Sequence, residues 1–156
     1  MNYFENITDQ EYIFATMLLV ANKMDTLLER ALSEYNITAK QWFMLIVAVN
    51  AFKEAPSIKE IAKVMGSSHQ NIKQLALKLE AKGMVVLEKD KRDLRTTKIT
   101  LTKECFQLFK KLEKEGLVFM NKFYKEIDSK EVKNARMFIS KIMNNLKDIE
   151  EEEGQK

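Results

Sequence analysis

Residues that interrupt regular structure are scarce in this chain. Its 156 residues include one proline and only four glycines, and so few breakers over this length favour long helices. Hydrophobic residues make up 46% and charged residues 31%, an ordinary globular balance. The length predicts a single domain, 1–156, able to bury a core.

Cysteine and histidine are scarcer still, with one residue of each. The lone cysteine, Cys105, excludes an intrachain disulfide framework and fits a reducing, cytoplasmic setting. No His/Cys/carboxylate cluster favours a metal site. The sequence also lacks a glycine-rich phosphate loop and evidently paired carboxylates, so nothing in it supports an enzyme, and no cofactor is expected.

Signals for export or membrane insertion are missing too. Residues 1–12 have no basic region ahead of an apolar run, which argues against a signal peptide. The longest apolar run of the first helical segment, Ala15–Ala21, is interrupted by Thr16 and falls far short of the roughly 20 residues of a membrane span. We therefore expect no membrane partner.

Positive charge is abundant in only one region. The net charge is +3, but residues 57–103 hold eleven Lys or Arg against five Asp or Glu, a net +6, which leaves −3 for the remainder. Contact with nucleic-acid phosphates would need such a concentration. Solvated helix faces would give the same count and stay an alternative.

Helix-forming patterns dominate the first half of the chain. Apolar residues recur every three or four positions over 10–34 on two faces, which predicts a long helix that packs on two sides. Capping boxes at Thr38–Gln41 and Ser57–Glu60 begin two further helices, the first of them roughly 39–53.

A tight turn and a hairpin follow. Gly66 ends the short helix, Ser67 or Ser68 caps the next one, and Gly83 ends that one after about Lys82. Two β-prone runs, 84–89 and 96–101, then flank the charged turn KDKRDLR. Helix, turn, helix and basic hairpin in this order describe a winged helix-turn-helix over 38–102, a module that places one helix in a DNA major groove.

Helical patterns return after Thr102. Asp128–Glu131 caps a last helix, whose apolar residues repeat in a heptad-like manner. These residues are Val132, Ala135, Ile139, Ile142, Leu146 and Ile149. The fold class expected is mainly α with a small β wing, in which segments 8–34 and 103–151 are dimerisation helices.

In order and spacing, a set of short motifs over about 38–105 resembles the multiple-antibiotic-resistance regulator (MarR) family of transcription factors. They are Gln41-Trp42, Glu60-Ile61-Ala62, Ser68, Leu79-Glu80, Gly83-Met84-Val85, Asp93-Leu94-Arg95 and Leu101-Thr102. The family often has glycine where this chain has Cys105. The resemblance implies a dimerisation region built from both chain ends, and effectors that bind between that region and the DNA-binding lobe.

The candidate DNA-reading helix presents polar residues in its first turns. The candidates are Ser67, Ser68, His69, Gln70, Asn71, Lys73, Gln74 and Lys78. Gln70 and Asn71 have the side chains that pair with adenine, and Lys73 suits guanine or phosphate. In isolation these residues are better explained as caps and solvated polar groups, whereas within this motif DNA contact is favoured.

The candidate wing residues are Lys91, Arg92, Asp93 and Arg95. Arg95 suits a narrow minor groove. Asp93 is too acidic to help binding directly, so we expect it to orient Arg95 or Arg92 by a charge-assisted hydrogen bond. The resemblance implies that the Asp93–Arg95 pair holds the wing in place. The alternative is an exposed charged turn that contributes nothing specific.

Two residue types invite other functions. Cys105 lies near Lys103, as a redox sensor would, but neighbouring Phe106 and Phe109 indicate structural packing instead. Methionines on candidate inner faces suit an adaptable pocket for a small ligand, although they are more often plain core. They are Met17, Met24, Met44, Met120 and Met143.

Together these features predict a homodimeric regulator that reads a pseudo-palindromic DNA site and responds to a small ligand. The alternative is a winged-helix protein-interaction module without DNA readout. A salt series separates the two, because DNA binding weakens steeply as salt rises.

Overall fold

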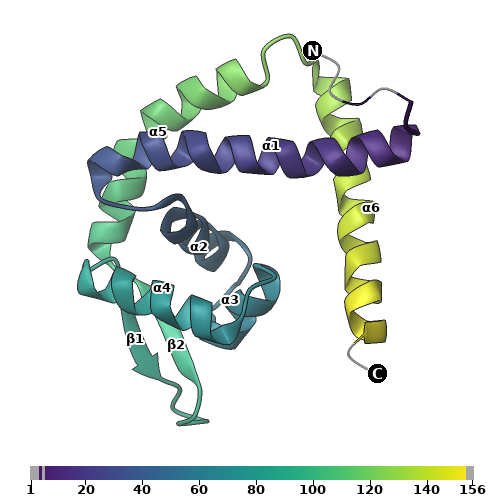
Figure 1. The fold of residues 1–156 in the computed structure, drawn as a ribbon. Helices are drawn as coiled ribbons and strands as arrows, with labels where there is room; N and C mark the ends of the chain where they lie inside the picture. Colours follow the sequence, from purple (N-terminus) through teal and green to yellow (C-terminus); the bar gives the residue numbers. More distant parts are fainter. Residues whose placement is uncertain (1–3, 5, 154–156) are drawn as a thin grey trace. The chain divides into compact units, whose positions relative to one another are not determined.

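The computed structural model describes Phe4 and residues 6–153 (Figure 1). Helix α1 (Asp9–Leu32) and a 3-10 turn (Ser33–Tyr35) lead into α2 (Ala39–Asn50), α3 (Ile58–Val64) and α4 (His69–Ala81). Strands β1 (Val85–Lys89) and β2 (Thr97–Leu101) form an antiparallel hairpin, and α5 (Lys103–Phe123) and α6 (Ser129–Glu153) follow. The prediction of a mainly helical fold with a small β wing is confirmed.

The chain divides into two compact units. The first runs to Lys110 and contains α1 to α4, the hairpin and the start of α5; the second begins at Lys111 and contains the rest of α5 and α6. The predicted division into one domain with dimerisation helices at both ends stays a prediction.

Local side-chain chemistry sets where the helices begin. The predicted capping boxes at Thr38–Gln41 and Ser57–Glu60 are present, and Asp128 and Glu131 cap α6 in the same reciprocal way. Thr8–Glu11, a box that the sequence analysis missed, begins α1. Each box satisfies backbone N–H groups that the helix itself cannot.

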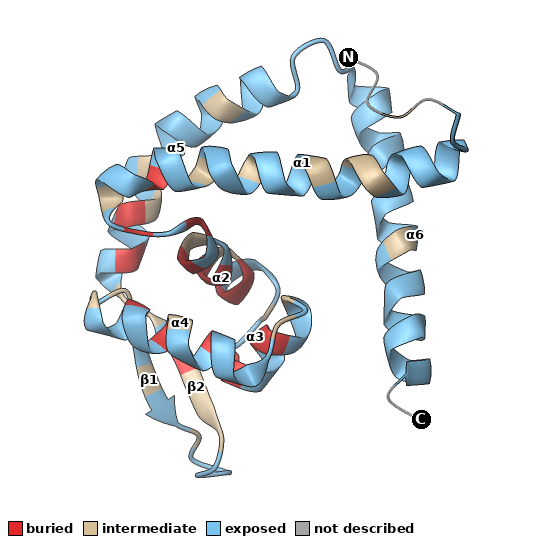
Figure 2. Ribbon diagram, in the orientation of Figure 1, coloured by how far each residue is buried: buried red, intermediate tan, exposed pale blue. Residues whose placement is uncertain are grey.

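The buried core of the described residues lies within the first unit (Figure 2). Its largest fully buried side chains come from α2, α3, α4, both strands and the start of α5. They are Met44, Leu45, Ile61, Ile72, Leu79, Ile99, Val85 and Cys105. The strand register pairs Leu87 with Ile99 and Val85 with Leu101, so alternate residues of the hairpin face this core.

The long helices bury little. Leu32 is the buried residue of α1, whereas Phe14 is 70% exposed, so the predicted packing on two sides is not made within the first unit. Every described residue of α6 is exposed except Ile142, which is half-buried. None of the helices formed by the described residues is long and apolar enough to cross a membrane.

The expectation that the methionines lie on inner faces was wrong at three of five positions, because helical periodicity does not by itself say which face is covered. Of the five methionines assigned to inner faces, Met44 is buried, Met24 is half-buried, and Met17, Met120 and Met143 are exposed.

Candidate nucleic-acid interface

The first turns of α4 present the predicted DNA-reading residues to solvent. Ser68 is the N-cap, and its Oγ accepts a hydrogen bond from the Asn71 backbone N–H at 3.2 Å. Ser67 is half-buried in the turn before the helix. The other candidates are exposed, namely His69, Gln70, Asn71, Lys73, Gln74 and Lys78. A free helix start of this kind offers donors and side chains to the edges of bases.

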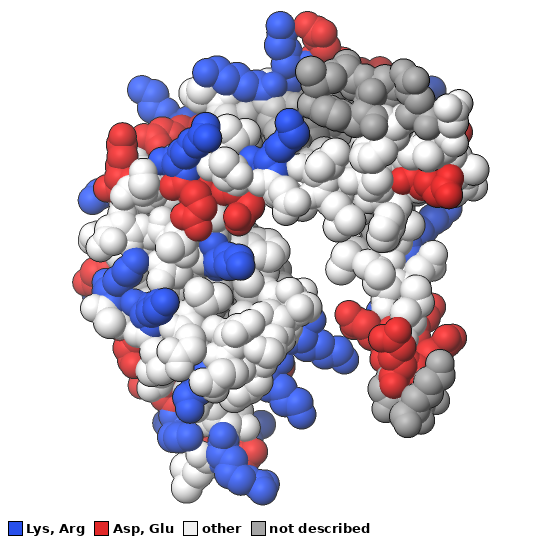
Figure 3. All heavy atoms as spheres, in the orientation of Figure 1, with Lys and Arg blue, Asp and Glu red and all other residues white. Residues whose placement is uncertain are grey.

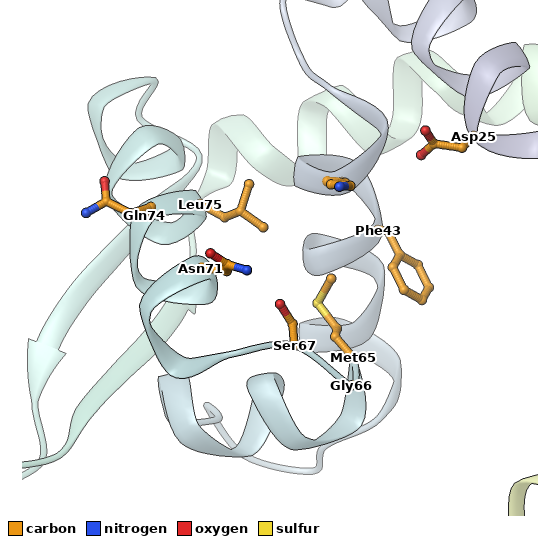
Figure 4. Close-up of a pocket in the computed structure, with 9 residues that line it drawn as sticks. Asp25, Phe43, Met65, Gly66, Ser67, Asn71, Gln74 and Leu75 are labelled. Carbon is orange, nitrogen blue, oxygen red and sulfur yellow. The ribbon is translucent and has the colours of Figure 1, made fainter. Parts of the chain in front are cut away.

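Three of these residues, Ser67, Asn71 and Gln74, also line a cavity. Asn71 and Gln74 are among the residues that line a hollow of about 580 Å³ beside α1, α2 and the α3–α4 turn. In Figure 4 the Asn71 side chain points toward Met65, whereas the Gln74 amide points away from it. Its other lining residues are Asp25, Lys40, Phe43, Met65, Gly66 and Leu75. Gln70 and Lys73 do not line it, so the exposed surface of α4 has a side that faces the cavity and a side that does not.

The opposite face of α4 is fixed firmly. Ile72, Ala76 and Leu79 are fully buried, each with 0% of its surface exposed. Glu80 Oε1 accepts a hydrogen bond from the Leu87 N–H of β1 at 3.0 Å. The helix is therefore held both by its apolar face and by a polar link to the hairpin, which sets α4 and the wing relative to each other.

A lysine at the end of α4 makes a third attachment. Lys82 Nζ donates to the Asn36 carbonyl at 2.5 Å and to Gln41 Oε1 at 3.0 Å. Gln41 is buried and also accepts from the Thr38 N–H. Lys82 was counted in the positive region, but its ammonium is directed into the protein.

The wing tip is built from two consecutive aspartate turns. Asp90 Oδ1 accepts from the backbone N–H groups of Arg92 at 2.7 Å and Asp93 at 3.3 Å. Asp93 Oδ1 accepts from the Arg95 N–H at 3.1 Å, and Asp93 Oδ2 accepts from Thr96 Oγ1 at 3.0 Å. Such side-chain-to-backbone bonds fix a tight turn without apolar packing.

These hydrogen bonds also stabilise the charged carboxylates. The bond from the Arg95 N–H holds the pKa of Asp93 below its ordinary value, and the bond from the Arg92 N–H does the same for the pKa of Asp90. Both residues are therefore ionised at neutral pH. Asp90 was not among the predicted site residues, although its position directly after a β-run and two residues before Arg92 is typical of an Asx turn.

The predicted pairing of Asp93 resolves in favour of Arg95. Arg95 Nε lies 3.3 Å from Asp93 Oδ1, while the Arg95 side chain is 95% exposed. Arg92 is bound through its backbone by Asp90 instead. Asp93 thus directs a guanidinium that remains almost wholly accessible, as a minor-groove contact requires.

Cations surround the wing (Figure 3). Lys89, Lys91, Arg92 and Arg95 are all exposed there, alongside Glu88 and Asp93, and Figure 3 shows a further group of Asp and Glu side chains toward the end of α6. Lys98 is the exception in the hairpin, since its ammonium lies between two carboxylates. The net charge of residues 57–103 therefore overstates the positive charge that is exposed to solvent.

Cys105 is a core residue. It is fully buried, and burial raises the pKa of its thiol to about 11. A thiol of that pKa is almost entirely protonated at neutral pH and is a poor nucleophile. The structural interpretation of Cys105 is favoured over a redox sensor. No group of three or more His, Cys, Asp or Glu among the described residues is placed to hold a metal ion.

The winged-helix segment is similar to a known protein family. Residues 35–96, which span α2, α3, α4, β1 and the wing, match the model of the MarR family. Over this segment the winged helix of the chain is similar to the MarR family. The part of the resemblance that lies within these residues is thereby confirmed.

Similar proteins extend the likeness beyond the MarR-family segment. The chain is 22% identical over 141 residues to a transcriptional activatory protein, BadR, of Rhodopseudomonas palustris, covering 89% of this chain and 81% of that protein. A MarR/EmrR family transcriptional regulator from Acinetobacter sp. ADP1 is similar in fold, with a TM-score of 0.78, 19% identity and coverage of 91% of this chain and 99% of that one.

A third similar structure contains nucleic acid. It is a crystal structure of the S. aureus MepR–DNA complex, with a TM-score of 0.73, 18% identity and coverage of 90% of this chain and 99% of that one. The matched proteins are named as transcriptional regulators, which agrees with the prediction of a regulator, and at these identities the likeness to the solved structures shows the fold of this chain.

Proposed function

We propose that this protein is a sequence-specific DNA-binding transcriptional regulator that acts in the cytoplasm as a homodimer on a pseudo-palindromic operator. The observation that carries the proposal is the joint display of an exposed α4 start and a wing ordered by its own aspartates. In this arrangement Gln70, Asn71 and Lys73 enter the major groove, and Arg95 enters the adjacent minor groove. The likeness to a fold solved with DNA supports it.

The homodimer rests on apolar residues that the described part of the chain leaves exposed. Large apolar side chains of α1 and α6 are 36% exposed or more. They include Ile13, Phe14, Leu18 and Val20 on α1, and Met137, Ile139, Met143, Leu146 and Ile149 on α6. Exposed apolar surface on this scale marks an interaction site, and the heptad-like spacing on α6 suits a second copy of the same helix. A two-fold dimer would read half-sites about 34 Å apart.

Regulation by a small ligand is part of the same proposal. The cavity beside α4 has the size of a small-molecule site and mixes apolar side chains, amides and one charge of each sign. Because Asn71 and Gln74 line it, a bound ligand would contact the recognition helix itself. It would shift DNA affinity by its differential affinity for the two states of the helix.

The test is binding of the purified protein to DNA upstream of its own gene across a salt series. We expect Arg95→Ala and Gln70→Ala each to weaken binding by about 1–3 kcal/mol. Lys110→Ala and Gln107→Ala are the matched controls, since both side chains are exposed on α5 within the same unit, and they should bind as the wild type does.

A second function would give a different result. A protein-interaction module without DNA readout predicts weak DNA binding with little salt dependence, whereas each phosphate contact should contribute a slope of about −0.9 in log K against log salt. Unchanged binding in both Arg95→Ala and Gln70→Ala would sink the DNA-reading proposal.

A further inference from the structure

Lys98 lies where the wing joins the helix-turn-helix. It pairs with Ser57 in an isolated antiparallel bridge outside the hairpin, and the Ile99 N–H donates to the Pro56 carbonyl at 2.9 Å. The residues that begin α3 therefore run along β2 on the side away from β1. Any movement of the wing relative to α3 has to break this short pairing.

The ammonium of Lys98 lies between two carboxylates from different elements. Its Nζ is 3.8 Å from Glu60 Oε2 on α3 and 3.9 Å from Asp90 Oδ2 at the start of the wing turn. The Lys98 side chain is 29% exposed and that of Asp90 is 23% exposed, against 95% for Arg95. Lys98 is thus withdrawn from the surface that its neighbours in the wing present.

Each carboxylate already has a structural task that keeps it ionised. Glu60 accepts hydrogen bonds from the N–H and Oγ of Ser57, both at 2.7 Å, in the capping box of α3. Asp90 holds the backbone of the wing turn. The Ser57 hydrogen bonds lower the pKa of Glu60, with a smaller contribution from Lys98, and the charge of Asp90 opposes that shift. Without Lys98, two ionised carboxylates would face each other at this junction.

We propose that Lys98 is a positioning residue for DNA reading. By neutralising Glu60 and Asp90 together, it holds the wing against α3 in the position from which Arg95 reaches the minor groove. It is not itself a phosphate contact. This inference rests on the proposed DNA-binding function. Isolated exposed ion pairs contribute little, but here one cation separates two like charges, so its removal replaces two attractions with a repulsion.

The first experiment separates positioning from phosphate contact. Lys98→Met keeps the aliphatic stem and removes the charge. We expect it to weaken binding to promoter DNA by about three- to tenfold, a modest electrostatic effect, and to leave the slope of log K against log salt unchanged. Lys73→Met is the matched control, because Lys73 is an exposed α4 lysine in the predicted interface. If Lys73 contacts a phosphate, its loss reduces the slope by about 0.9. A slope reduced in Lys98→Met would overturn the proposal.

A double-mutant cycle tests whether Lys98 acts through the wing. In an Arg95→Ala background, Lys98→Met should cost almost nothing further, because the contact that it positions is gone. Glu60→Gln added to Lys98→Met should restore most of the lost affinity, since it removes the repulsion and keeps a capping side chain. Fully additive losses, or no rescue, would contradict the proposal.

Amide hydrogen exchange tests the same idea without DNA. Lys98→Met should speed exchange at the wing amides of Arg92 and Thr96, which are bonded to Asp90 and Asp93, and leave the α4 amides near Ile72 unchanged. Unchanged wing exchange would overturn the role of Lys98. If the wild type binds no DNA while the exchange result holds, the proposed function fails and the structural role of Lys98 stands.

Discussion

The winged helix and helix α6 use apolar residues in opposite ways. In the winged helix they close a core in which Met44, Ile61 and Leu79 are fully buried. In α6, by contrast, Ile139, Met143 and Leu146 are exposed, and no described residue is buried. The first region therefore carries its stability within one chain. Under the proposed homodimer, the folding of α6 and its assembly with a second copy are coupled. Measurements over a range of protein concentrations can separate this coupled process from the stability of the winged helix.

Truncating the core should have the largest effect. Leu79→Ala removes a fully buried side chain from α4, and we expect it to lower the free energy of unfolding by about 2–5 kcal/mol at every protein concentration. Leu77→Ala is the control on the same helix, since Leu77 is 42% exposed, and it should change stability by under about 0.5 kcal/mol. Urea unfolding measures both. Equal losses in the two variants would mean that α4 packs differently.

An acidic residue on the apolar face of α6 should act only on assembly. Ile139→Asp would bury an unpaired charge in the proposed dimer, and we expect a rise of about 100-fold or more in the dimer dissociation constant. Asn144→Asp adds the same charge on the opposite face of the helix and should leave the dimer intact. Sedimentation across a concentration series provides the measurement. A wild type that is monomeric at every concentration would contradict the proposed dimer.

The smallest effect concerns pH at the start of α3. The hydrogen bonds from Ser57, and then Lys98, lower the pKa of Glu60 from its ordinary 4.5. A depressed acid contributes stability that is complete above its unfolded pKa and is lost as pH falls through its folded pKa. Between pH 6 and pH 3 the wild type should therefore lose more stability than Glu60→Gln, by under about 1 kcal/mol. Parallel unfolding curves of the two proteins over this range would exclude the effect.

The features predicted correctly from sequence are those that depend on residues close together in the chain. Capping boxes such as Ser57–Glu60 involve residues three apart, and a glycine at positive φ ends a helix wherever the pattern stops; Gly66 and Gly83 have φ of 56° and 69°. The order of these signals was enough to predict the winged helix, which the match to the MarR family over 35–96 confirms. The choice of Arg95 as the partner of Asp93 is local in the same sense.

The features missed depend on residues that are distant in sequence. Lys82 reaches Asn36, which is 46 positions away, and Lys98 lies between Glu60 and Asp90. A count of charges gives each lysine the same weight, because it cannot tell an ammonium directed inward from one directed outward. The exposure of Met17, Met120 and Met143 was missed for a related reason, since a helical repeat fixes the spacing of a face but not what covers it.

Asn71 and Gln74 lie on the side of α4 that faces the cavity, whereas Gln70 and Lys73 do not. Under the proposed function, a substitution at either of the first two positions changes the operator preference and the effector preference together. Substitutions at Gln70 or Lys73 change the operator preference alone. Homologues that bind a new operator and keep the same effector should therefore differ first at Gln70 and Lys73. Asn71 and Gln74 should change together with the other residues that line the cavity.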